Sequence, residues 1–213
     1  MKILQYLFIS LGHKILKFLP YTSIRILSVP IGTLYFLLTF RSSIKLFKRK
    51  EIFNELKINY KPLIVKINYT RYWLETLWLT NKNFSKYISP HVEIENLEYV
   101  EKLKKQYPGL IFALPHLGNW EFAIPIGNSI KLNLLAVAEP LNNSYVLNWF
   151  KSLRESLGIE IIIGGKGQNT FDLLVNKLKS GKDICLLSER SIKKSGVATE
   201  FFGQLAAFPK GPV

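Results

Sequence analysis

The feature that most constrains the fold is an alternation of short apolar runs with amphipathic segments after Gly109. Four runs have the length and aliphatic content of buried strands, at residues 110–114, 134–137, 159–163 and 184–187. Helices with one apolar face are predicted at 144–157 and 170–180, each closed by a glycine, Gly158 or Gly181. Strands joined through helices pair in parallel, so we predict an α/β fold with a parallel-rich central sheet flanked by helices.

The first 50 residues differ in character from this alternating region. They contain nine basic residues and no acidic one, and they are rich in Leu, Ile and Phe. Residues 3–19 show helical spacing of apolar side chains, and Pro20 is expected to end that helix. Nucleic-acid binders rarely combine so much aliphatic surface with basic residues, whereas a membrane interface needs both. We therefore predict an N-terminal basic amphipathic membrane-docking helical segment on an anionic membrane surface, and no nucleic-acid partner.

The uncharged run at residues 26–40 contains Pro30 and Gly32. It is shorter than the ~20 residues of a spanning helix, so we interpret it as buried or interfacial. A short or tilted span, and an ordinary buried helix pair in a globular core, remain open. Residues 51–213 are predicted to form a second domain, which begins with helical residues 51–86, a short strand at 92–94 and a charged helix at 96–106.

Composition narrows the possible partners and chemistries. Lys and Arg number 29 against 15 Asp and Glu, and this net charge of +14 favours an anionic partner. Cys185 is the only cysteine, which excludes an internal disulfide and a cysteine-based zinc site. The three histidines lack metal-ligand spacing, and the chain contains neither a phosphate-binding G-x-x-x-x-G-K-[ST] loop nor a G-x-S-x-G nucleophile elbow. We therefore expect no metal and no covalent serine intermediate.

The stretch that follows the first apolar run carries the candidate chemistry. His116 comes directly after the predicted strand, Gly118 permits a turn, Asn119 is a good N-cap, and Glu121 follows. Sites in open α/β sheets lie at the carboxyl ends of strands. Histidine can accept a proton near neutral pH, and a carboxylate bonded to its other ring nitrogen would orient it. On spacing alone, a buried structural histidine with a surface glutamate is an equal alternative.

This H-L-G-N-W-E stretch resembles the H-x-x-x-x-D/E signature of the glycerolipid acyltransferase superfamily. Within it, the chain is most similar to bacterial lipid A biosynthesis acyltransferases and the related phosphatidylinositol mannoside acyltransferases. The resemblance runs from residue 50 to the end, through blocks in the family's order and approximate spacing. These blocks are A-E-P at 138–140, R-E-S-L-G at 154–158, L-L-S-E-R at 186–190, G-V at 196–197, E-F-F-G at 200–203 and P-K-G-P at 209–212.

The resemblance implies a role for each matching residue. His116 is expected to be the general base and Glu121 its orienting carboxylate. Four further residues are expected to bind substrate: Glu139, Arg154, Glu189 and Arg190. The family usually carries a second acid beside this arginine, but the present chain has Ser191, which leaves that role open.

The chain's own pattern leaves alternatives for some of these positions. For Arg154, the sequence alone favours a solvated arginine at the rim of its helix. Phe201 and Phe202, with Gly203, are expected to shape an acyl or acceptor groove, and ordinary core packing is an equal alternative.

The resemblance also implies a reaction. An acyl chain would pass directly from acyl-CoA or acyl carrier protein to a hydroxyl of a membrane glycolipid, without metal or bound cofactor, at the cytoplasmic face of the bacterial plasma (inner) membrane. A phosphatidylinositol mannoside is the first acceptor hypothesis and a lipid A precursor the second. An inactive membrane-binding partner protein is the third, favoured if His116 is sealed in the core or far from Glu121. Because chains of this family continue past the Gly-Pro, we expect this chain to be C-terminally incomplete.

Overall fold

The computed structural model describes residues 1–40, 61–164, 169–188, 196–201 and 203–209. The chain divides into two compact units: residues 11–79 form one, and residues 1–10 with 80–213 form the other. Helix α1 (Lys2–Leu16) belongs to both, because the division falls within it. The predicted domain boundary after residue 50 falls outside the described residues.

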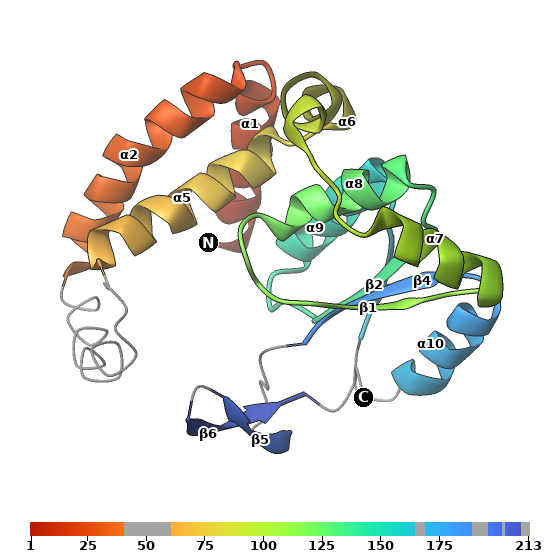
Figure 1. The fold of residues 1–213 in the computed structure, drawn as a ribbon. Helices are drawn as coiled ribbons and strands as arrows, with labels where there is room; N and C mark the ends of the chain where they lie inside the picture. The colour runs from red at the N-terminus through yellow and green to blue at the C-terminus, as the bar shows by residue number, and fades with distance from the viewer. Residues whose placement is uncertain (41–60, 165–168, 189–195, 202, 210–213) are drawn as a thin grey trace. The chain divides into compact units, whose positions relative to one another are not determined.

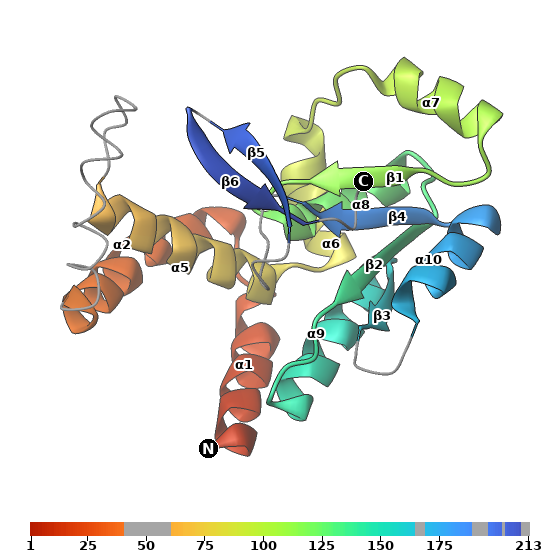
Figure 2. The ribbon, with the colours of Figure 1, turned by 90° about the horizontal axis from the view of Figure 1, so that it is seen from below.

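The larger unit is built on a four-stranded parallel sheet (Figure 1). Its strands are β1 (Ile111–Leu114), β2 (Leu134–Ala138), β3 (Glu160–Ile163) and β4 (Asp183–Leu187), in the order β1-β4-β2-β3. Figure 2 shows β1 and β4 side by side in the same direction, with Leu114 opposite Leu187. Each predicted strand is confirmed to within one residue at either end, and so is the parallel α/β class.

Helices cover both faces of this sheet. The 3-10 helix η3 (Trp120–Phe122) and α8 (Ala123–Ser129) connect β1 to β2, α9 (Ser144–Leu157) connects β2 to β3, and α10 (Thr170–Lys179) connects β3 to β4. The first two connections advance across the sheet and the third returns. Right-handed crossovers in opposite directions lie on opposite faces, which explains why α8 and α9 lie on one face and α10 on the other (Figure 1). Helix α9 has the predicted bounds, and α10 ends one residue earlier than predicted.

A buried carboxylate at the amino end of the sheet joins three strands. Asp183, the first residue of β4, is fully buried. It accepts hydrogen bonds from the backbone N–H of Leu110 at 3.0 Å and of Asn133 at 2.8 Å, directly before β1 and β2. The Nζ of Lys104, on helix α7 (Leu97–Gln106), donates to the same carboxylate at 2.8 Å. These charge-assisted bonds fix where the three strands begin.

The segment before β1 departs partly from expectation. The predicted strand at 92–94 is wrong: these residues run between the 3-10 helix η2 (Ser89–His91) and α7 without strand pairing. They are mostly exposed, so two apolar side chains there gain little by joining a sheet. Before them lie the short helix α6 (Asn81–Asn83) and the π-helix η1 (Phe84–Ile88).

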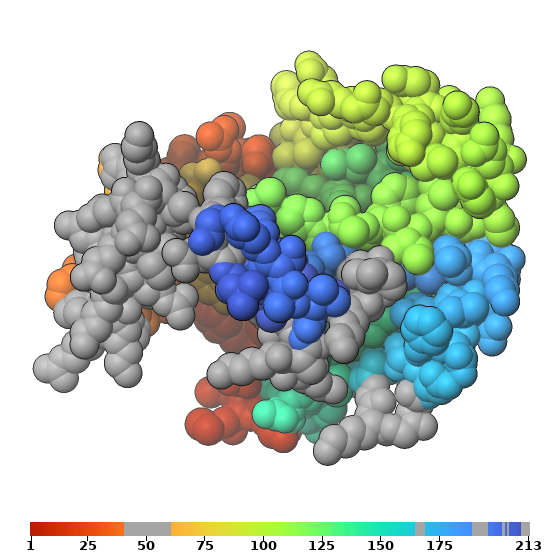
Figure 3. All heavy atoms as spheres, turned by 60° about the horizontal axis from the view of Figure 1, so that its bottom comes forward, coloured from red at the N-terminus to blue at the C-terminus, as the bar shows by residue number. Residues whose placement is uncertain are grey.

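The last described element is an antiparallel hairpin that the sequence did not predict. Strand β5 (Val197–Phe201) pairs with β6 (Gln204–Phe208), and Gly203 takes a left-handed φ of 73° in the turn. The side chains of β5 are exposed, and the hairpin stands at the surface in Figure 3. Phe201 packs edge-on against Phe208 on the paired strand, with ring centroids 5.5 Å apart. Phe201 is 53% exposed, so the core-packing hypothesis is wrong for this residue, while the groove hypothesis is not tested. The side chain of Phe202 lies outside the described residues.

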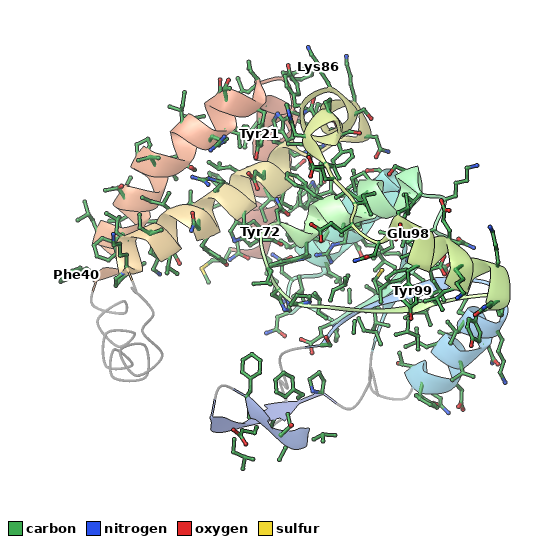
Figure 4. All side chains as sticks on the ribbon, in the orientation of Figure 1. Tyr21, Phe40, Tyr72, Lys86, Glu98 and Tyr99 are labelled. Atoms are coloured by element: carbon green, nitrogen blue, oxygen red, sulfur yellow. The ribbon has the colours of Figure 1, made fainter. Side chains whose placement is uncertain are left out.

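The smaller unit pairs α2 (Tyr21–Leu38) with α5 (Pro62–Trp78). A Cβ on Gly32 of α2 would lie 2.6 Å from the Cα of Ile67 on α5, so only glycine allows this close approach. Tyr21, labelled at the start of α2 in Figure 4, donates from its hydroxyl to Oε1 of the buried Glu75 at 2.8 Å. Burial, and next the charge of Glu75, raise the pKa of Tyr21 to about 12.

The helices of residues 1–40 expose much apolar surface. Leu4, Phe8 and Leu11 on α1 are more than half exposed, as are Ile26 and Leu38 on α2. Of the described helices, α2 alone is long and apolar enough to cross a membrane, and only 17% of that stretch is buried. Helix α2 begins before the uncharged run, because residues 21–25 form its first turn. Pro30 lies inside the helix. The helix predicted at 3–19 is found as α1, but it ends at Leu16, three residues earlier than predicted. Pro20 is the N-cap of α2 and not the residue that ends α1.

Candidate active site

The turn after β1 has the predicted form. The backbone N–H of Leu117 donates to the carbonyl of Pro115 at 2.8 Å, and Gly118 has a φ of 59°. A Cβ on Gly118 would meet nothing within 4 Å, so the left-handed backbone rather than a lack of space calls for glycine. Asn119 then caps η3, because its side-chain oxygen accepts from the N–H of Glu121 at 3.1 Å. The chain thus places His116 on a strand-to-helix turn at the carboxyl end of the sheet.

His116 lies at the surface of this turn rather than inside the core. Its side chain is half-buried, and its ring packs edge-on against Trp120 with centroids 4.7 Å apart. Edge-on packing of this kind is a favoured arrangement of aromatic rings and restricts the plane of the imidazole. Because the residue is only partly buried, the interpretation of His116 as a buried structural residue is wrong.

Glu121 is the buried member of the motif. Its side chain is 1% exposed, and Arg154 from α9 binds both of its carboxylate oxygens. The Arg154 Nε donates to Oε2 at 3.0 Å and the Nη2 donates to Oε1 at 2.6 Å. The guanidinium also lies 5.4 Å from the ring centroid of Phe150, one turn earlier on α9. This two-pronged pair compensates a charge that would otherwise be costly to bury.

The pair corrects two expectations. Glu121 is buried rather than at the surface, and Arg154 is not a solvated rim arginine but is bound to that carboxylate. The pair also connects η3, which follows the His116 turn, to the last turn of α9. The structure therefore brings Arg154 to the His-x-x-x-x-Glu motif, while its predicted contact with substrate stays a prediction.

The other candidate residues follow neighbouring strands. Glu139 is exposed directly after β2. Glu189 and Arg190, after β4, lie outside the described residues. The residue before them, Ser188, donates from its N–H to the carbonyl of Leu114 at 3.0 Å, two residues before His116. Because the strands are parallel, the carboxyl ends of β1, β2 and β4 share one edge of the sheet.

Two residues that the sequence did not single out support the ion pair. The side chain of Asn81 donates to the carbonyl of Ser156, two residues after Arg154, at 3.0 Å. Phe84 is buried and packs on Phe122, the neighbour of Glu121, with ring centroids 6.2 Å apart. Both contacts join residues about 40 or more positions apart, so no local pattern could have revealed them.

The remaining chemistry near the sheet is limited. Burial, and next the charge of Asp183, raise the pKa of Cys185 on β4 to about 11, so its thiol is protonated near neutral pH and a poor nucleophile. Within the described part of the chain, no three His, Cys, Asp or Glu side chains form a group that could hold a metal ion. The site thus holds a half-buried histidine on the turn, five residues before a buried, charge-compensated carboxylate.

Comparison with known proteins adds an independent observation. The family model described as bacterial lipid A biosynthesis acyltransferase matches residues 1–213. A phosphatidylinositol mannoside acyltransferase of Mycolicibacterium smegmatis is 31% identical over 149 residues, covering 68% of this chain and 48% of the relative. The protein of the same description from Mycobacterium tuberculosis (strain ATCC 25618 / H37Rv) is 31% identical over 148 residues, covering 68% and 46%. The chain matches about half the length of these curated relatives.

Proposed function

The chain belongs to the bacterial lipid A biosynthesis acyltransferase family, and on that premise we propose that it transfers a fatty acyl chain to a hydroxyl group of a membrane glycolipid. The resemblance inferred from the motif blocks is thereby confirmed at the level of the family. The observation that carries the proposal is the half-buried His116 on the turn at the carboxyl edge of the sheet, followed five residues later by the buried Glu121 with its bound arginine.

We assign the proton transfers to His116. As the acceptor oxygen attacks the thioester carbonyl, the imidazole takes the hydroxyl proton, and the tetrahedral intermediate forms. The C–S bond then breaks, and the imidazolium returns the proton to the leaving thiolate. Backbone N–H groups or a cation would stabilise the oxyanion. Direct transfer of this kind needs neither a metal nor a bound organic cofactor.

Glu121 is assigned as the orienting carboxylate of this base. Arg154 holds both carboxylate oxygens, and a carboxylate oxygen can accept more than one hydrogen bond. Rigid support of this kind improves general-base catalysis because the reacting geometry is set before substrate binds. Glu139, Glu189 and Arg190 remain our candidates for contacts with substrate, since they follow strands whose carboxyl ends share the same edge.

For the acceptor we favour a phosphatidylinositol mannoside, because the curated relatives bear that description. The donor would be acyl-CoA or acyl carrier protein. The exposed apolar residues of α1 and α2, together with the basic residues of this region, suit docking on an anionic membrane surface. We therefore place the reaction at the cytoplasmic face of the bacterial plasma membrane.

There are two alternatives to this proposal: a different acceptor, and a function without catalysis. The description of the family model favours a lipid A precursor as acceptor. An inactive membrane-binding partner protein is the candidate of another class, and the accessibility of His116 argues against it.

The test is a transfer assay in lipid vesicles with palmitoyl-CoA and either a phosphatidylinositol mannoside or a lipid A precursor. Products are read by mass spectrometry. We expect one acyl group to be added to the mannoside, and His116→Ala to lower the rate by a hundredfold or more, about the contribution of a general base. His91→Ala, which removes an exposed histidine before α7, is the matched control and should retain the rate. Equal rates for the two variants would refute the assignment of His116.

A further inference from the structure

A cluster of four aromatic rings lies across the α2–α5 pair. On α5, the centroids of Tyr69, Tyr72 and Trp73 lie 5.9–6.4 Å from one another. Tyr35 of α2 stacks on Tyr69 at 6.3 Å, with planes 29° apart. Tyr69 is 49% exposed, and the other three rings are partly exposed. The cluster therefore presents aromatic surface and phenol groups to the outside instead of closing a core.

A cation completes this cluster. The Nζ of Lys66, one turn before Tyr69 on α5, lies 4.3 Å from the centroid of the Tyr35 ring. A lysine over an aromatic face keeps its alkyl stem on apolar surface and its ammonium near water. Tyr, Trp and Lys together are the side chains that populate the boundary between lipid tails and water.

Apart from one buried glutamate, the charged side chains of α2 and α5 are all basic. Their basic residues are Arg25, Lys66 and Arg71, and their single acidic residue, Glu75, is buried and bound by Tyr21. Apolar side chains are exposed on both helices as well, with Leu34 and Leu37 on α2 and Ile64 and Val65 on α5. A positive surface with aliphatic and aromatic side chains complements an anionic lipid surface.

We propose that Tyr35, Tyr69, Tyr72 and Trp73 with Lys66 form an interfacial anchor that holds the α2–α5 pair at the headgroup level of an anionic lipid surface. The proposal rests on the proposed membrane function and extends it, because it makes α5 part of a docking surface that the sequence assigned to residues 1–50. The aromatic rings set how deeply the α2–α5 pair inserts into the lipid, and the ammonium group of Lys66 is attracted to the negatively charged headgroups.

The experiment is a sedimentation assay of the whole chain with vesicles of neutral lipid, alone or mixed with an anionic phospholipid. Tyr69→Ser is expected to weaken binding several-fold on both kinds of vesicle, because the ring inserts regardless of charge. Lys66→Gln is expected to weaken binding about fivefold on anionic vesicles only, the effect of one basic residue near such a surface. Circular dichroism of each variant checks that the helices remain folded.

Matched controls are available on α7. Tyr99→Ser and Lys105→Gln remove an exposed tyrosine and an exposed lysine outside the cluster, and binding should stay unchanged. If Tyr69→Ser binds as Tyr99→Ser does, the proposal is overturned. A third set of vesicles contains a phosphatidylinositol mannoside. A loss confined to this third set equally overturns the proposal, since that result indicates a sugar site.

Vesicle binding requires no acyl transfer, which separates this proposal from the proposed function. His116→Ala should bind vesicles as the original chain does. If the transfer assay fails but Tyr69→Ser loses vesicle binding as expected, only the proposed function is refuted. If acyl transfer is seen but Tyr69→Ser binds vesicles normally, only the anchor is refuted.

Discussion

At the scale of single residues, the site depends on how a buried carboxylate is compensated. Glu121 is 1% exposed, whereas Arg154 retains 23% exposure of its side chain. Removing the partly exposed partner leaves a buried charge unpaired, which costs far more than the intact pair contributes over two apolar residues. The same geometry makes the positions of Glu121 and Arg154 interdependent, so the pair should act as a unit in stability.

The first prediction concerns this pair. Arg154→Met should lower the free energy of unfolding by about 3 kcal/mol, because Glu121 is left without its cation. Adding Glu121→Gln should recover part of that loss, a coupling that a double-mutant cycle by chemical denaturation measures. Glu155→Gln, which breaks the exposed pair with Lys151, should cost less than about 1 kcal/mol. Equal losses in Arg154→Met and Glu155→Gln would show that the buried pair is not energetically special.

The second prediction concerns Glu160 at the start of β3. Hydrogen bonds from Lys177 at 2.6 Å, and next from Lys182, lower its pKa. A carboxyl whose pKa is lower in the folded chain stabilises the fold above its unfolded pKa, and this stability is lost as the pH falls through the folded value. Glu160→Gln should therefore lower the melting temperature at neutral pH, and the difference should vanish in acid. A difference that persists in acid would assign it to packing instead.

Residues differ in how far the sequence predicts them. His116, Gly118 and Asn119 are placed as predicted, because a turn and a cap depend on neighbours within a few positions. The burial of Glu121 and its pairing with Arg154, 33 residues away, depend on how α9 packs beside η3. Helical periodicity shows which side of α9 is apolar, but it does not show which buried group meets the arginine at the edge of that side.

At the scale of elements, the spacing of apolar residues predicted those helices and strands whose formation depends on residues close together in the chain. The four strands, α7, α9 and α10 were found because each carries an apolar face or run with a clear start or stop. The cap at Asn119 indicated a helix after the His116 turn, but the seven-residue α8 is too short for a periodic signal that would give its bounds. The β5–β6 hairpin was missed, since β5 is exposed. The role of Asp183 was missed too, because its two backbone donors lie 50 and 73 residues away.

The third prediction tests Asp183. An amide in place of the carboxylate has one acceptor oxygen for the N–H groups of Leu110 and Asn133, and it leaves Lys104 without its partner. Asp183→Asn should therefore lower the free energy of unfolding by about 3 kcal/mol in chemical denaturation. Glu101→Gln, at an exposed position of α7, is the control and should change it by less than about 0.5 kcal/mol. A loss as small as the control's would mean that the strands hold their register without the carboxylate.

The fourth prediction tests the contact between α2 and α5. Gly32→Ala should destabilise the pair by about 1–3 kcal/mol, because the new methyl group meets the backbone of Ile67 at 2.6 Å. Gly12→Ala introduces the same methyl group on α1, but its nearest neighbour is the end of the Leu77 side chain at 3.3 Å. The gain in helix propensity should make Gly12→Ala neutral or stabilising. Hydrogen exchange of α5 amides measures both, and equal protection in the two variants would contradict the close approach.

At the scale of the whole molecule, net charge and exposed apolar surface act together. The chain carries a charge of +14, and its described N-terminal helices leave large aliphatic side chains exposed. Salt screens the attraction between this charge and an anionic surface, but it does not screen the burial of apolar side chains. Binding to lipid should therefore have a salt-sensitive part and a salt-resistant part, whichever acceptor the enzyme uses.

The fifth prediction follows from these two parts. Raising the salt from 0.1 M to 1 M shortens the screening length from ~10 Å to ~3 Å, so binding to anionic vesicles should weaken towards the level on neutral vesicles. Binding to neutral vesicles should persist, because it depends on buried apolar area. Flotation at a series of salt concentrations measures both curves. Anionic binding that ignores salt would mean that the positive charge serves another partner.

The two ends of strand β4 have consequences for laboratory evolution. Asp183 secures the amino end, while Leu187 pairs with Leu114 near the His116 turn at the other end. At about 3.3 Å per residue, four steps of strand separate the two ends by roughly 13 Å. Substitutions that far apart usually contribute independently. Substitutions that stabilise the amino end can therefore be combined with destabilising substitutions around His116, and their effects on the free energy of unfolding should add.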